Sequence, residues 1–198
     1  MAHAAVRPAL PADAPEIARI QCDTWRTAYT RILPAAVLDE LDVTAVEASW
    51  REAIDDDRAA VLIATEGDWT VGFCVVGAAP AEETAGADGV PAPDVAETGL
   101  IASLLVEPRW GRRGHGGRLL LAAGEELRAA GARRGIVWVP IADAASLAFY
   151  KLAGWAPDGL SRTLDTGDRT VRELRLTGPL DFQAAEVNED PESGQPAE

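Results

Sequence analysis

A short stretch of the chain combines glycine with positive charge in a way that suits anion binding. From Gly111 to Arg118 it reads Gly-Arg-Arg-Gly-His-Gly-Gly-Arg, after an apolar segment and before one with helical spacing. Free main-chain N–H groups at a helix start attract negative charge, and glycines let phosphate oxygens approach the backbone. A tight turn without a ligand would also use glycine, but it would not need three arginines. The stretch therefore predicts a site for a phosphate-bearing ligand.

Two familiar phosphate-binding motifs do not fit this stretch. A P-loop ends in Gly-Lys followed by Ser or Thr, whereas the one lysine of this chain is Lys151. A dinucleotide fingerprint has the order G-x-G-x-x-G, whereas Gly111 to Gly117 has the order G-x-x-G-x-G-G. We therefore expect a different class of phosphate ligand.

The stretch lies between an expected strand and an expected helix, and similar patterns recur along the chain. Apolar and alternating runs predict strands over residues 3–8, 59–67, 69–78, 98–106, 135–139 and 169–178. Helical spacing predicts helices over residues 11–29, 34–54, 143–154 and from the glycine-rich turn to about Ala130. A hairpin followed by a βαβ unit predicts an α/β fold with a mixed central sheet of six or seven strands, flanked by helices on both faces.

The chain is long enough for one domain, with two acidic segments set apart from it. Its 198 residues, 47% of them hydrophobic, can bury a single core, which we expect within residues 1–180. Residues 79–97 are rich in Ala, Pro, Gly and acid, which predicts a mobile loop. Residues 181–198 are acidic and poor in apolar side chains, which predicts a disordered tail.

The charge of the chain argues against nucleic acid as a partner. The formal net charge is -14, although residues 98–180 carry twelve Lys and Arg against eight acids. An acidic total repels duplex DNA, while a local basic excess suits a small polyanion. We therefore expect a small charged ligand.

Nothing in the sequence predicts a membrane span, a disulfide or a metal site. There is no apolar run of 18 residues and no secretory signal pattern, so we expect a cytoplasmic protein without a membrane partner. Cys22 and Cys74 have no paired spacing, and His3 and His115 are equally isolated. The cysteines are therefore interpreted as buried small side chains in a reducing compartment.

Two stretches resemble the landmarks of the GNAT superfamily of N-acetyltransferases. Members carry Val-x-Pro at a strand end and then Gln/Arg-x-x-Gly-x-Gly/Ala, and here Val106-Glu107-Pro108 precedes the motif Gly111 to Gly116. The second landmark has Asn, then Tyr seven residues on, then Gly-Phe; here Asp143, Tyr150, Gly154 and Trp155 stand at these places. The opening is similar to that of bacterial members, and the resemblance covers about residues 4–177. It implies a GNAT-like fold.

The resemblance implies that a primary amine attacks the thioester of acetyl-CoA directly, with both substrates bound and no metal. A phenol has a pKa of about 10 and stays protonated at neutral pH, so Tyr150 is the expected acid for the departing thiolate. The alternative for Tyr150 is a core aromatic. The expected cofactor-binding residues are Leu104, Leu105, Val106, Arg112, Arg113, Gly114, His115, Gly116, Gly117, Arg118, Asp143 and Ser146.

Some positions depart from the family pattern. Gly111 stands where Gln or Arg is usual, and Asp143 replaces an Asn that donates a hydrogen bond. Leu100 occupies the place of a glutamate that accepts the proton of the amine in many relatives, which leaves no base assigned; Ser103 with a water chain is one alternative. Two rival functions therefore stay open: a non-catalytic acyl-CoA-binding or regulatory module, and a protein-interaction domain without a cofactor.

The acceptor is expected to be a small-molecule or peptide amine. Trp25, Tyr29 and Trp50 lie on the first helices, where the family forms its acceptor site, although aromatic side chains at such positions also form cores. The acidic first half of the chain would attract a cationic acceptor such as a polyamine, an aminoglycoside or a basic peptide. The resemblance also allows a homodimer, because strand edges in this fold often pair between subunits.

Overall fold

Seven strands form one mixed sheet in a computed structural model that describes residues 3–56, 58–167 and 169–181. The sheet order is β1-β2-β3-β4-β5-β7-β6. The strands are β1 (Ala4–Pro8), β2 (Ala59–Glu66), β3 (Trp69–Ala78), β4 (Thr98–Val106), β5 (Arg134–Pro140), β6 (Ala156–Asp165) and β7 (Thr170–Gly178). β4 and β5 run parallel, and the other neighbouring pairs are antiparallel. The predicted α/β fold with a mixed sheet is confirmed. The tail predicted to be disordered lies, except for Asp181, outside the described residues.

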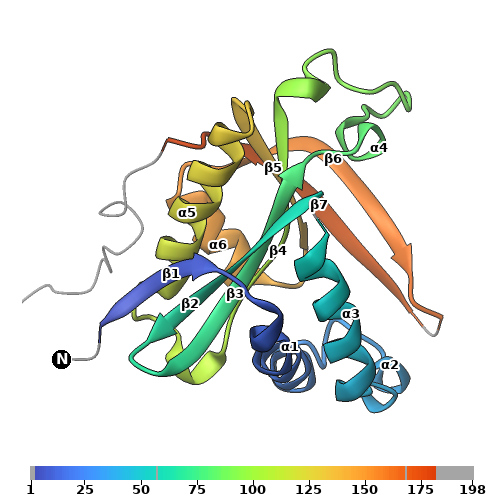
Figure 1. The fold of residues 1–198 in the computed structure, drawn as a ribbon. Helices are drawn as coiled ribbons and strands as arrows, with labels where there is room; N and C mark the ends of the chain where they lie inside the picture. Colours follow the sequence, from blue (N-terminus) through green and yellow to red (C-terminus); the bar gives the residue numbers. More distant parts are fainter. Residues whose placement is uncertain (1–2, 57, 168, 182–198) are drawn as a thin grey trace, which may run out of the picture.

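Helices cover both faces of the sheet (Figure 1). They are α1 (Ala14–Ala28), α2 (Ala35–Asp39), α3 (Val43–Asp55), α4 (Ala81–Thr84), α5 (His115–Ala129) and α6 (Ala144–Leu152). α1 and α3 pack on one face, and α5 packs on the other. The helical region expected over residues 34–54 is divided, because Asp42 caps α3 by accepting from the N–H of Thr44 at 2.9 Å. In the described part of the chain, no helix is both long enough and apolar enough to cross a bilayer.

Strand β6 was missing from the expected elements. Its sequence contains Pro157 and Gly159, which weaken a strand pattern, and most of its residues are exposed. It pairs with β7 at the edge of the sheet, with a register shift between Pro157 and Ser161. A polar edge strand has no buried face to produce an apolar alternation, so the sequence carried little signal for it.

The core has two parts because alternate strand residues face opposite sides of the sheet. Leu62 packs in the cluster that contains Leu119 and Leu120 of α5, whereas Ile63 packs with Ile17 of α1. Trp50 belongs to the second part: its ring meets Phe73 edge-on with centroids 5.0 Å apart. Its Nε1 donates to Gln21 Oε1 at 2.7 Å. Of the two interpretations that the sequence left open for Trp50, acceptor site or core, the structure shows the core.

The indole of Trp155 is accommodated by two glycines on neighbouring strands. Gly135 of β5 and Gly178 of β7 are register partners, and a Cβ atom at either position would overlap the Trp155 ring. Trp155 is almost fully buried. Glycine is thus required here by close approach, and it fixes the landmark residue Trp155 against the sheet.

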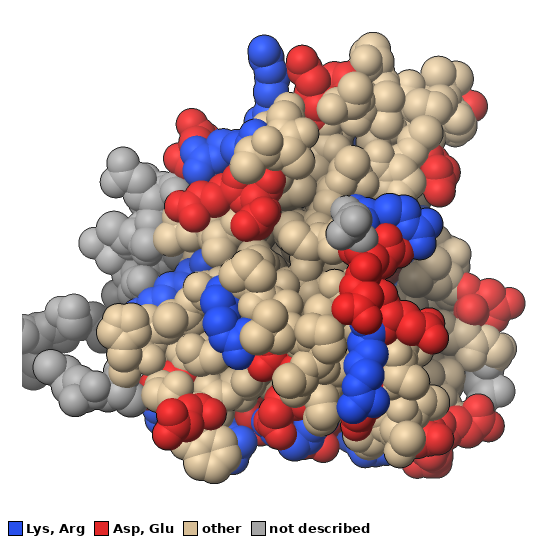
Figure 2. All heavy atoms as spheres, viewed as in Figure 1, with Lys and Arg blue, Asp and Glu red and all other residues tan. Residues whose placement is uncertain are grey.

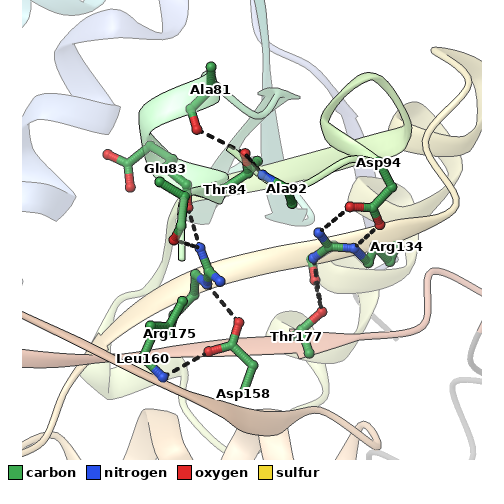
Figure 3. A network of polar contacts seen from close by, with 12 residues as sticks. Ala81, Glu83, Thr84, Ala92, Asp94, Arg134, Asp158, Leu160, Arg175 and Thr177 are labelled. Atoms are coloured by element: carbon green, nitrogen blue, oxygen red, sulfur yellow. Dashed lines mark hydrogen bonds and ion pairs between the residues drawn. The ribbon is translucent and has the colours of Figure 1, made fainter. Parts of the chain in front are cut away.

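Residues 79–97 lie over β6 and β7 and are held there by arginines (Figures 1 and 3). Arg175 Nη1 donates to the carbonyl oxygens of Glu83 at 2.8 Å and Ala85 at 3.0 Å. Farther along the segment, Arg134 Nε donates to Asp94 at 2.6 Å. The mobility expected for this segment stays a prediction, but the structure gives it a short helix and defined ion pairs.

Candidate active site

The parallel strands β4 and β5 diverge and leave space between them. Their pairing extends only from Thr98 with Arg134 to Leu100 with Ile136 in the described residues. On the other side of β4, the register with β3 shifts between Val75 and Val76, so one extra residue of β4 is accommodated. Such a bulge bends a strand and increases its twist. Beyond it, β4 remains paired with β3 but not with β5, which leaves the main chain of its second half free on one side.

A cavity of about 200 Å³ occupies this divergence. It is lined by α1, by β4 and β5, by the start of α6 and by β7. The lining residues are Trp25, Tyr29, Ala102, Ser103, Leu104, Leu105, Val137, Trp138, Val139, Pro140, Asp143, Ser146, Tyr150 and Glu173. Of the predicted site residues, the cavity brings together Leu104, Leu105, Asp143, Ser146 and Tyr150, while Val106 pairs with Gly72 outside it.

A second, larger hollow of about 490 Å³ lies by the first helices and shares no lining residue with the cavity. Its lining residues are Arg26, Thr30, Ala35, Leu38, Asp39 and Arg169. No residue of either family landmark lines it. The divergence of β4 and β5 is therefore the better candidate for the chemistry.

The glycine-rich turn follows β4 and leads directly into α5. Gly114 is the N-cap of α5 and has a left-handed backbone with φ 78°, while Arg112 has φ 60°. No acceptor within the described residues faces the main-chain N–H groups of residues 112–117. These donors lie at the positive end of the α5 dipole, so the turn has the features of an anion site.

The arginines of the turn differ in their surroundings. Arg113 forms an ion pair with Glu66 at 3.3 Å, and its guanidinium lies 4.8 Å from the centroid of the Trp110 ring. Arg118 Nη1 donates to the carbonyl oxygen of Arg113 at 3.0 Å, which supports the turn from within. The side chain of Arg112 is exposed and has no polar partner in the described structure. Arg112 is thus the arginine left available to a ligand.

His115 begins α5, but its side chain is directed away from solvent. It is 2% exposed, and its Nε2 lies 2.8 Å from Glu66 Oε2 on β2. Its ring meets Trp110 edge-on with centroids 6.3 Å apart. The contribution of His115 to an anion site is therefore through its main chain, while its imidazole ties the turn to β2.

Tyr150 combines both interpretations that the sequence allowed. Its ring packs against Phe149 and Trp155, with centroids 5.1 and 5.4 Å away, and the residue is 4% exposed. It also lines the cavity. Burial raises the pKa of the Tyr150 phenol, and nearby Cys74, Tyr29 and Asp143 act in the same direction. The phenol is therefore held in its protonated form, as a proton donor requires.

Asp143 has a structural role that the family comparison of motifs did not reveal. Its carboxylate is the N-cap of α6, accepting from the N–H of Ser146 at 3.0 Å and from its Oγ at 2.7 Å. The hydroxyl of Tyr29 donates to Asp143 at 3.4 Å. An N-cap needs an acceptor oxygen, which Asp supplies as well as Asn does. Burial, followed by the Asp143 charge, raises the pKa of Tyr29.

Glu107 is the middle residue of the Val-x-Pro landmark, and no role for its side chain was predicted from the sequence. Its carboxylate accepts from Arg19 of α1 at 3.1 and 3.3 Å and forms an ion pair with Arg109 at 2.8 Å. The pair joins α1 to the end of β4 directly before the glycine-rich turn. A single glutamate in a turn gives no sign of a partner 88 residues away, so only the fold reveals this contact.

Glu173 of β7 is a charged residue of the cavity that the sequence did not single out. The alternation of β7 suggested that its charged residues face solvent, yet Glu173 is only 9% exposed. Its side chain is covered by Arg162 of the neighbouring strand β6, which donates to Glu173 Oε2 at 2.6 Å and also binds Glu83 of residues 79–97. The sequence pattern of β7 could not show this cover.

The described residues contain no group of three or more metal-ligating side chains. The fold and the cavity thus define an α/β protein with two diverging parallel strands and a glycine-rich turn at the start of a helix.

The family model described as "Acetyltransferase (GNAT) family" matches residues 16–155. The uncharacterized N-acetyltransferase YuaI of Bacillus subtilis (strain 168) is 33% identical over 148 residues, which are 74% of this chain and 76% of that protein. The chain belongs to the GNAT acetyltransferase family and is an acyltransferase, as the two landmarks predicted.

Solved structures share the fold. A ribosomal-protein-alanine N-acetyltransferase from Brucella melitensis has a TM-score of 0.67 at 21% identity and covers 88% of this chain and 99% of its own. The yncA protein of Salmonella typhimurium, solved with its cofactor acetyl-CoA, has a TM-score of 0.65 at 21% identity and covers 92% and 97%. PaiA N-acetyltransferase from Thermoplasma acidophilum, in complex with coenzyme A, has a TM-score of 0.68 at 13% identity and covers 89% and 99%.

Proposed function

We propose that this protein is an N-acetyltransferase that transfers the acetyl group of acetyl-CoA to a primary amine. The observation that carries the proposal is the glycine-rich turn, which follows β4, a strand that lines the cavity. Its N–H groups over residues 112–117 have no acceptor within the described residues. Pyrophosphate oxygens suit such donors. Two of the similar solved structures contain acetyl-CoA or coenzyme A, which supports the choice of cosubstrate.

The chain's own groups fit the different parts of this cosubstrate. Residues 113, 114, 116 and 117 would donate main-chain hydrogen bonds to the pyrophosphate, and Arg112 would add charge from its exposed side chain. The pantetheine arm would follow Leu104 and Leu105, whose main chain is paired with β3 but not with β5. Fixed backbone donors on this strand suit the polarised carbonyl of a thioester.

The proposed reaction uses Tyr150 as the proton donor. The bound thioester supplies an activated acetyl carbon, and the neutral amine attacks it directly. Tyr150 then gives its phenolic proton to the departing sulfur. The phenol carries this proton at neutral pH, because burial raises its pKa. The remaining cavity walls exclude water and orient the amine.

The acceptor would enter beside the aromatic side chains of α1. Trp25 and Tyr29 are stacked, with centroids 6.5 Å apart, and both line the cavity. On the face of the molecule shown in Figure 2, Asp and Glu side chains lie among Lys and Arg without forming one extended patch. The carboxylates that would select an acceptor are therefore those of the cavity walls, since this face carries no extended acidic patch. A small-molecule or peptide amine fits these walls.

Calorimetric titration with acetyl-CoA tests the proposal, using the wild type, Gly114→Glu and Gly131→Glu. Both glycines have positive φ, 78° and 94°, and they lie at opposite ends of α5. The strain of the substitution is thus similar, but only Gly114→Glu adds a carboxylate to the proposed pyrophosphate site. We expect wild-type binding that Gly114→Glu weakens by at least about tenfold and that Gly131→Glu retains.

Three other results would contradict the proposal. Absence of wild-type binding would leave a domain without a cofactor as the better interpretation. Equal loss in both variants would mean that strain, and not position, removes binding. Binding without transfer to any primary amine would favour a non-catalytic acyl-CoA-binding or regulatory module.

A further inference from the structure

The proposed reaction lacks a group that removes a proton from the acceptor amine. Most amines are protonated at neutral pH, so a base must act before the attack. Leu100 has no ionisable group, and the hydroxyl of Ser103 is a weak base. Two carboxylates remain in the walls of the cavity, those of Asp143 and Glu173.

Asp143 is poorly suited to accept a proton. Its Oδ1 accepts from the N–H of Ser146, and its Oδ2 accepts from the hydroxyls of Ser146 and Tyr29. As the N-cap of α6, it also lies at the positive end of a helix dipole. Both oxygens of Asp143 are therefore engaged in hydrogen bonds, and its role is to cap α6 and to add a carboxylate to the cavity wall.

Glu173 is held in place and keeps one oxygen free. Arg162 Nε donates to Glu173 Oε2 at 2.6 Å, and no donor within the described residues faces Oε1. The guanidinium of Arg162 lies 4.4 Å from the centroid of the Trp138 ring, and its Nη1 also donates to Glu83 at 2.9 and 3.0 Å. Arg162 thus pairs with two carboxylates, and the cluster of Arg162, Glu173 and Glu83 has a net negative charge.

The walls of the cavity suit a cation. Two carboxylates and the aromatic side chains of Trp25, Tyr29 and Trp138 line it, and the described lining contains no Lys or Arg. An ammonium group is attracted both by carboxylates and by the faces of aromatic rings. An acceptor with its own carboxylate beside the amine would be repelled by these walls.

We propose that Glu173 binds the ammonium group of the acceptor and takes a proton from it, and that the acceptor is an amine without an adjacent carboxylate. This inference rests on the proposed function. It places the base on β7, because Leu100 on β4 cannot accept a proton. Amines of peptide N-termini, alkylamines and polyamines belong to the predicted class, and free α-amino acids do not.

The protons of this step balance. Glu173 Oε1 takes one proton from the ammonium group, which frees the lone pair of the nitrogen. That lone pair forms the C–N bond as the C–S bond breaks, and the electron pair of the C–S bond stays on sulfur. Sulfur takes the phenolic proton of Tyr150, and the second proton of the nitrogen restores the phenol. Glu173 then releases its proton to water, so one proton is set free in each turnover.

Thiol release from acetyl-CoA tests the inference with alaninamide, alanine and spermidine as acceptors. Alaninamide and alanine differ at the carboxyl group, so their ratio of kcat/KM measures the repulsion by the walls. The variants are Glu173→Gln, which keeps the shape of the side chain, and Glu83→Gln, which removes charge from the other partner of Arg162 and leaves the cavity unchanged. Calorimetry with acetyl-CoA and thermal unfolding are measured on each.

We expect the wild type to use alaninamide or spermidine in preference to alanine. In Glu173→Gln, kcat/KM for the preferred amine should fall roughly 100-fold while acetyl-CoA affinity is retained. The alaninamide-to-alanine ratio of kcat/KM should also fall, because only Asp143 then repels the carboxylate of alanine. Glu83→Gln should stay within about threefold of the wild type. If Glu173→Gln does not fold, Glu173→Asp is the second variant. Its side chain is one methylene shorter, so the carboxylate is kept but lies farther from the acceptor. This variant should lower kcat/KM while keeping the preference for alaninamide.

Other outcomes would overturn the inference. Activity of Glu173→Gln within about threefold of the wild type would exclude Glu173 as the proton acceptor. An equal loss in Glu83→Gln would mean that Glu173 acts only by positioning Arg162. A wild type that binds acetyl-CoA but acetylates none of the three amines, or that prefers alanine, would refute the acceptor class. A wild type that does not bind acetyl-CoA would refute the proposed function itself.

Discussion

Arg175 of β7 donates to the main-chain carbonyl oxygen of Glu83 on α4 at 2.8 Å, and this bond joins the sheet to residues 79–97 (Figure 3). The same side chain forms an ion pair with Asp158 of β6 at 2.7 Å and is 6% exposed. One guanidinium therefore holds two strands and the covering segment together. A buried ion of this kind is stabilising only while its partners are all present.

Replacement of this guanidinium should destabilise the fold. We expect Arg175→Met to lower the free energy of unfolding by about 3 kcal/mol, because Asp158 would be left partly buried without its cation. Urea unfolding measures this change. Arg172→Met, an exposed position on the same strand, is the control and should stay within about 0.5 kcal/mol of the wild type. Equal effects of the two substitutions would contradict the role of Arg175.

Removal of the phenolic hydroxyl of Tyr150 should affect chemistry more than binding. In Tyr150→Phe the ring keeps its packing against Phe149 and Trp155, but no proton donor remains beside the proposed thiolate. We expect kcat to fall roughly 100-fold with unchanged acetyl-CoA affinity and an unfolding temperature close to that of the wild type. Steady-state kinetics and calorimetry measure these quantities. If Tyr150→Phe has the kcat of the wild type, Tyr150 is not the proton donor and has only a structural role.

A methyl group at Gly178 should disturb the core. The added Cβ would overlap the Trp155 indole, so the ring or the strand must shift. We expect Gly178→Ala to lower the free energy of unfolding by about 1–3 kcal/mol. Trp155→Phe introduced into this variant should recover part of the loss, because the smaller ring makes space. Additive losses in the double variant would show that the two residues do not interact.

Acid should destabilise the protein through paired carboxylates. A hydrogen bond from Arg134, together with its charge, lowers the pKa of Asp94 below the ordinary value of 3.8. Burial opposes ionisation of Glu107, but Arg19 and Arg109 lower its pKa below the ordinary value of 4.5. These groups contribute stability above the unfolded-state pKa values, and this contribution is lost as the pH falls through the folded-state values.

The pH dependence can be measured by urea unfolding at pH 7 and pH 3. The wild type should lose stability between these values, and Glu107→Gln should lose less, because its amide does not titrate. Stability of Glu107→Gln at pH 7 should be lower than that of the wild type, since Arg19 and Arg109 would lose their anion. If the stability of both proteins depends on pH in the same way, Glu107 does not contribute to the loss of stability in acid.

The family and most of the fold could be predicted from local sequence patterns. The turn from Gly111 to Gly117 and the end of α6 before Gly154 depend on residues close together in the chain. Gly114 and Gly154 both have the left-handed backbone that glycine adopts readily. Strands with one apolar face were visible for the same reason. Strand β6 was not, because a polar edge strand with Pro157 and Gly159 lacks that face.

The sequence by itself therefore determined the glycine-rich turn before α5, the place of Tyr150 on α6 and the mixed sheet. The first two follow from local spacing, and the sheet follows from the order of the elements. Only the tertiary structure decided which carboxylates meet them. Glu173 is buried beneath Arg162 of the neighbouring strand β6, which also binds Glu83, and the oxygens of Asp143 accept hydrogen bonds from Ser146 and Tyr29. Such contacts depend on the packing of segments far apart in the chain, and no local pattern encodes that packing.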